Sequence, residues 1–76
     1  MKVVYSYLEM RSIVDQRNKP YKFKGRCVDN KKAGFGIKVW EDNAYLKGYW
    51  NDNFLKGFAY FKNKDSKIFM GKILIN

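Results

Sequence analysis

Residues 23–36 read FKGRCVDNKKAGFG, and residues 46–59 read LKGYWNDNFLKGFA. The second stretch begins 23 residues after the first, and Gly25, Gly48 and Gly71 follow one another at the same spacing. Seven positions are identical when residues 23–45 are compared with residues 46–68, where ordinary composition gives about one or two. Self-similarity at a fixed period indicates a repeat protein. The sequence therefore predicts units at residues 23–45 and 46–68, with a partial third unit at 69–76.

Each unit opens with apolar residues placed two positions before and two positions after the repeated glycine. The preceding residues are Phe23, Leu46 and Phe69, and the following residues are Cys27, Trp50 and Ile73. A spacing of two puts side chains on one face of a β-strand, so the residues between them point to the other face. The first segment of each unit is therefore predicted to be an amphipathic strand.

A polar turn and a second apolar segment complete each unit. The turn-prone stretches are Asp29-Asn30-Lys31-Lys32 and Asp52-Asn53, and the second segments run over residues 34–40 and 57–61. Further turn residues close them at Asp42-Asn43 and Asp65-Ser66. Two strands joined by a short turn of this composition form a β-hairpin. The predicted fold class is mainly β, a single-layer antiparallel meander of hairpins.

The two stretches resemble the MORN repeat, whose pattern is an aromatic residue, any residue, Gly, any residue and Trp, then a turn and Gly-x-Gly. The resemblance covers residues 21–73, with Leu46, Cys27 and Ala59 departing from the pattern. It implies a ladder of hairpins, and its members look like non-enzymatic scaffolds at membranes, cilia and the cytoskeleton, within larger assemblies. The glycines that define the repeat are Gly25, Gly34, Gly36, Gly48, Gly57 and Gly71.

Residues 1–20 lie outside the period and form a separate capping segment ahead of the ladder at 21–76. Ser6-Tyr7-Leu8-Glu9 has the form of a capping box, which favours a short helix from about Tyr7 to Arg17. The alternation of Val3, Tyr5 and Tyr7 favours a strand instead. In either form, the segment is expected to cover the exposed edge of the first unit.

Catalytic chemistry is not expected from this composition. The chain has no histidine, one cysteine (Cys27) and three serines, so a hydroxyl or thiol nucleophile has no usual base and a zinc site lacks its ligands. We expect no enzyme activity, metal or cofactor. The lone cysteine favours a reducing, intracellular compartment. No apolar stretch approaches the ~20 residues that span a bilayer, which favours a soluble or peripheral protein of the cytoplasm or cytoskeleton.

Two stripes are the candidate binding surfaces. The aromatic stripe, which could equally be core, comprises Phe23, Phe35, Leu46, Trp50, Phe58 and Phe69. The basic stripe, which could equally be a solvated edge, comprises Lys22, Lys24, Arg26, Lys47 and Lys72.

A protein partner on the aromatic stripe is the first hypothesis for function. The chain has a net charge of +9, so the alternative hypothesis is that the basic stripe binds anionic phospholipid membranes. Binding of single-stranded nucleic acid is the third hypothesis. The apolar strand at residues 69–75 is expected to be an open edge, available to a partner strand or to a second copy.

Overall fold

The Asp-Asn pairs of the repeat form two-residue turns with the backbone in the left-handed region. In the computed structural model, which describes residues 3–75, φ is 50° at Asp29 and 64° at Asn30, with 52° and 72° at the matching Asp52 and Asn53. Positive φ at both central residues is a type I′ turn, whose twist matches that of paired antiparallel strands. These turns join β2 (Tyr21–Val28) to β3 (Lys31–Trp40) and β4 (Tyr45–Asn51) to β5 (Phe54–Lys62). Because the turns are so short, β3 and β5 begin three residues before the predicted second segments.

Longer turns join successive hairpins and also recur at the 23-residue period. The amide of Asn43 donates to the carbonyl of Trp40 at 3.0 Å, and the amide of Trp40 donates to the carbonyl of Ala44 at 2.9 Å. The same two bonds form within residues 63–67, where the chain enters β6 (Ile68–Ile75). Every connection in the ladder therefore repeats, which accounts for the regular return of each strand beside the last.

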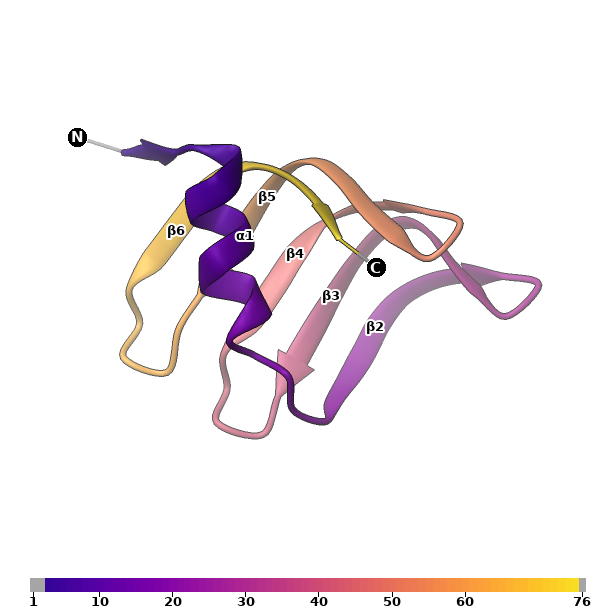
Figure 1. Ribbon diagram of the computed structural model, residues 1–76. Helices are drawn as coiled ribbons and strands as arrows, with labels where there is room; N and C mark the ends of the chain where they lie inside the picture. The colour runs from indigo at the N-terminus through magenta and orange to yellow at the C-terminus, as the bar shows by residue number, and fades with distance from the viewer. Residues whose placement is uncertain (1–2, 76) are drawn as a thin grey trace.

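Within residues 3–75 the sheet has six strands in the order β1-β6-β5-β4-β3-β2, and Figure 1 shows helix α1 lying across one of its faces. Strands β2 to β6 pair as an antiparallel meander. The predicted mainly β fold class is confirmed.

The N-terminal segment contains both of the predicted alternatives. Val4–Tyr5 is strand β1, and Tyr7–Asp15 is α1, with the capping box between Ser6 and Glu9 formed. The helix ends two residues before the predicted Arg17.

The prediction that the N-terminal segment covers the first unit was wrong. Strand β1 pairs in parallel with β6, Val4 opposite Met70 and Tyr5 opposite Gly71, because the chain starts at the β6 edge and crosses the sheet through α1 before β2 begins. This pairing covers Met70 and Gly71, part of the β6 edge that was expected to be open. Among residues 3–75 the two edge strands are therefore the two-residue β1 and the eight-residue β2, and β2 is the longer unpaired edge.

Alternation along the strands gives the sheet two faces. The helix face, which packs against Met10 and Val14 of α1, supplies most of the core; its most buried strand residues are Trp40, Leu46, Trp50, Leu55, Ala59, Phe61 and Ile73. The open face bears the residues that alternate with these along each strand. They include Lys22, Lys24, Phe35, Tyr45, Lys47, Tyr49, Phe58, Tyr60 and Lys72.

Candidate functional site

The structure divides the predicted aromatic stripe between the two faces. Leu46 and Trp50 are 0% and 3% exposed on the helix face, and Phe23 and Phe69 are partly buried against the same core. These four residues are therefore core: Trp50 packs against Phe23, and α1 packs on the same face over β6. Trp50 and Leu46 are not accessible to a partner in the folded chain.

Phe35 and Phe58 lie on the open face and are accessible. Phe35 is 50% exposed and Phe58 is 43% exposed. Tyr49 stands between them in strand order, is 68% exposed, and packs its ring against Phe35 at 5.5 Å between centroids. We call Phe35, Tyr49 and Phe58 the aromatic row; they come from the successive strands β3, β4 and β5. Tyr49 was not in the predicted set, although its position between Gly48 and Trp50 already placed it on the opposite face from the core.

The glycines next to the aromatic row are the points where strand pairing is irregular. Register shifts occur between Gly25 and Cys27 in the β2–β3 pair and between Lys47 and Trp50 in the β4–β5 pair. Gly34 and Gly57 lie opposite these shifts with φ of 92° and 107°, a conformation that residues with a side chain rarely adopt. The repeated Gly-Phe pair therefore supplies a bulge followed directly by an exposed ring.

The other repeat glycines are positions of close approach rather than of unusual backbone. A Cβ on Gly25 would lie 2.6 Å from the Cα of Gly36, and a Cβ on Gly48 would lie 2.6 Å from Leu55 Cδ1. Neighbouring strands and core side chains occupy the space that side chains here would need.

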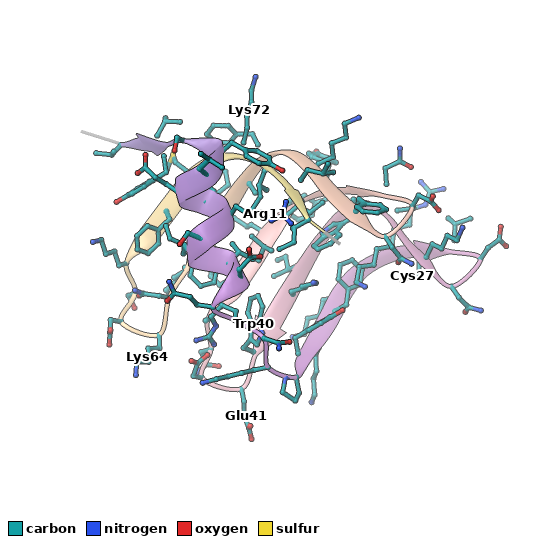
Figure 2. The ribbon with its side chains drawn as sticks, viewed as in Figure 1. Arg11, Cys27, Trp40, Glu41, Lys64 and Lys72 are labelled. Carbon is teal, nitrogen blue, oxygen red and sulfur yellow. The ribbon has the colours of Figure 1, made fainter. Side chains whose placement is uncertain are left out.

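Four of the five predicted basic residues lie on the open face, distributed over β2, β4 and β6. The strand register puts the side chains of Lys22, Lys24, Lys47 and Lys72 on the open face. Figure 2 shows Lys72 pointing outward, away from α1. The Nζ of Lys47 lies 5.6 Å from the ring centroid of Tyr45 and 5.3 Å from that of Tyr60, a distance at which cation and ring attract.

The fifth basic residue, Arg26, lies beside the β2–β3 bulge. Its Cβ is 3.7 Å from the position that a Cβ on Gly34 would occupy. Within the described part of the chain, no strand carries Asp or Glu, so the acidic residues lie in α1 and in the turns. The charged side chains of the described strands are therefore all basic.

Two lysines that the sequence did not single out lie on the helix face among aromatic rings. Lys32 Nζ is 5.4 Å from the ring centroid of Phe23, and Lys38 Nζ is 4.4 Å from that of Tyr21 and 5.2 Å from that of Trp50. Burial lowers the pKa of Lys38, and the charge of Lys32 lowers it further. Burial raises the pKa of Tyr21, but hydrogen bonds and charge from the two lysines outweigh it, so the pKa falls below its ordinary value.

The chemistry available to this surface is that of contact and charge. Among residues 3–75, no group of three or more His, Cys, Asp or Glu side chains is placed to hold a metal ion. None of the helices in this range is long and apolar enough to cross a membrane. No family model, curated protein or solved structure matches the chain. Membership of the MORN family therefore stays a prediction from the residues quoted above.

Proposed function

We propose that the chain is a non-enzymatic interaction module, of the MORN-repeat type, that binds a protein partner within a larger assembly through its open face. The aromatic row carries the proposal. Three large rings, 43% to 68% exposed, stand on successive strands of one sheet face. Clustered exposed apolar surface marks interaction sites, and aromatic residues are enriched at the centres of protein interfaces.

The surroundings of the aromatic row also suit an interface. The rings project from paired strands, so they lose little conformational freedom when a partner covers them. The lysines on the same face supply a polar rim that favours partners with acidic surfaces. The resemblance to MORN scaffolds adds the cytoskeleton, cilium or membrane periphery as the proposed location.

The test compares partner capture by the wild-type chain and by the Phe35→Ala/Tyr49→Ala/Phe58→Ala variant, with quantitative mass spectrometry. The variant should fold, because all three rings are largely outside the core, and circular dichroism checks this. We expect it to lose the specific partner. The matched control is Tyr7→Ala, which removes an aromatic ring that is 41% exposed on α1 and should leave capture unchanged. Equal recovery by wild type and the triple variant would contradict the proposal.

A second candidate function is peripheral binding to anionic phospholipid membranes, favoured by the absence of Asp and Glu from the described strands. Each Lys or Arg near an anionic surface contributes about 1 kcal/mol. Replacing Lys22, Lys24 and Lys72 with Gln should weaken co-sedimentation with phosphoinositide vesicles, whereas replacing Lys64 and Lys67 in the β5–β6 turn should not. Absence of wild-type binding at low salt would reject this function. A salt-dependent anisotropy signal with a short oligonucleotide would instead favour the third hypothesis, single-stranded nucleic acid.

A further inference from the structure

The two edge strands of the sheet differ in length: β1 has two residues and β2 has eight. At one edge, β1 pairs with β6, and Arg11 of α1 donates from Nη1 to the carbonyl of Leu74 at 3.4 Å. At the other edge, β2 pairs with β3, and within residues 3–75 no strand lies on its far side. Seven of its eight residues are exposed. Alternate backbone N–H and C=O groups of such a strand point away from the sheet and can pair with an added strand.

The side chains of β2 select what can be added. Lys22 and Lys24 point to the open face, while Tyr21 and Phe23 point to the helix face, as their partners Trp40 and Lys38 show. Strand β2 has Lys22, Lys24 and Arg26 and no acidic residue. Pairing with the same strand of a second copy would bring these cations together, and like charges on facing strands are destabilising. The β2 edge is therefore unfavourable for self-association.

We infer that the β2 edge binds an extended acidic segment of a partner protein by strand addition. The added strand would carry Asp or Glu on the face shared with Lys22 and Lys24, and apolar residues on the face shared with Tyr21 and Phe23. A hollow of about 490 Å³ at the N-terminal end of β2 leaves room for a terminal side chain; it is lined by Pro20, Tyr21, Lys22, Val39, Trp40 and Glu41. The inference rests on the proposed function as a binding module and adds a partner class and a second surface.

The test is fluorescence anisotropy with two labelled peptides of equal composition. One alternates Glu and Val over eight residues, matching the length of β2, and the other has four Glu followed by four Val. Strand addition requires the alternation, so we expect the alternating peptide to bind at least tenfold more tightly. Equal affinities would overturn the inference, since charge attraction alone would then explain binding, and absence of binding would overturn it as well.

Charge reversal locates the site. The Lys22→Glu/Lys24→Glu variant should lose the alternating Glu-Val peptide and bind an alternating Lys-Val peptide. Lys47→Glu/Lys62→Glu, on the interior strands β4 and β5, is the matched control and should retain the Glu-Val peptide. Loss of binding in the control alone would overturn the assignment to β2.

Cys27, the single cysteine of the chain and exposed on β2, gives an independent readout. Bound Glu-Val peptide should slow its alkylation by iodoacetamide, and an unchanged rate would place the peptide elsewhere and overturn the inference. Wild type should also remain monomeric in sedimentation velocity. A dimer in which Cys27 is protected from alkylation would show that a second copy occupies the β2 edge, and would overturn the inference.

The Phe35→Ala/Tyr49→Ala/Phe58→Ala variant should bind the Glu-Val peptide as wild type does. The two experiments therefore test different surfaces: failure of partner capture would contradict binding through the aromatic row, and failure of peptide binding would contradict strand addition at β2.

Discussion

The indole Nε1–H of Trp50 donates a hydrogen bond to the backbone carbonyl of Gly36, 3.1 Å away in the buried part of the helix face. The indole belongs to the second unit and the carbonyl to the first. The same indole packs edge-on against Phe23, with ring centroids 5.5 Å apart. Successive units are therefore joined by specific side-chain contacts as well as by strand pairing.

Replacing Trp50 with Phe should destabilise the chain. The hydrogen bond to Gly36 is lost and a buried acceptor is left without it, which costs about 1–3 kcal/mol. Urea unfolding followed by circular dichroism measures the difference. Tyr49→Phe, on the adjacent but exposed position, is the control and should change stability by less than about 0.5 kcal/mol. Equal effects of the two substitutions would argue against this role for Trp50.

Leu46 and Phe35 belonged to one predicted stripe but should respond differently to truncation. Leu46 is 0% exposed, so Leu46→Ala should lower the free energy of unfolding by about 2–5 kcal/mol. Phe35 is 50% exposed, and Phe35→Ala should have a much smaller effect. Thermal unfolding of the two variants checks the division of the stripe between faces, and a larger loss for Phe35→Ala would refute it.

Gly71 should be sensitive to substitution because of β1. A Cβ at this position would collide with the backbone carbonyl oxygen of Tyr5 and would lie 2.8 Å from Met10 Cγ. Gly71→Ala is therefore expected to displace the β1–β6 pairing and to increase amide exchange in residues 3–15. Gly57→Ala is the informative comparison, since nothing lies within 4 Å of its added Cβ and only the positive φ is strained. It should lower the free energy of unfolding by about 1–3 kcal/mol, without faster exchange in the N-terminal segment.

Acid should remove the contact between Arg17 and Asp42. Arg17 Nη2 donates to Asp42 Oδ1 at 2.6 Å, and this hydrogen bond lowers the pKa of the Asp42 carboxyl. A folded-state pKa below the unfolded value of about 3.9 means that the stabilisation is present above that pH and is lost as pH falls through the folded-state pKa. Asp42→Asn should flatten this part of the stability profile, as measured by urea midpoints between about pH 2 and pH 6. An unchanged profile would contradict the assignment.

The repeat, the hairpins and the turn positions could be predicted from the sequence because they depend on local chemistry. Asp29-Asn30 and Asp52-Asn53 tolerate positive φ, and this is a property of those residues wherever they occur. The capping box of Ser6 and Glu9 is local in the same sense and predicted the start of α1.

The candidate site was predicted only in part, since residue type does not reveal which face a partner strand will share. Phe35 and Trp50 are both large and aromatic, yet the register that places Phe35 opposite Tyr49 puts it on the open face, while Trp50 lies on the other. Lys38 looks like a surface residue in sequence, but it is 6% exposed among the rings of Tyr21 and Trp50.

The sequence by itself determined a mainly β, glycine-anchored ladder with basic strands, because period, alternation and turn chemistry act over a few residues. Only the tertiary structure decided that α1 packs on one face, that β1 pairs with part of the β6 edge and that β2 is left as the long unpaired edge. These outcomes depend on contacts between residues more than 60 positions apart, such as Tyr5 with Gly71. Contacts at that separation follow from the curvature and register of the whole sheet, which no local pattern encodes.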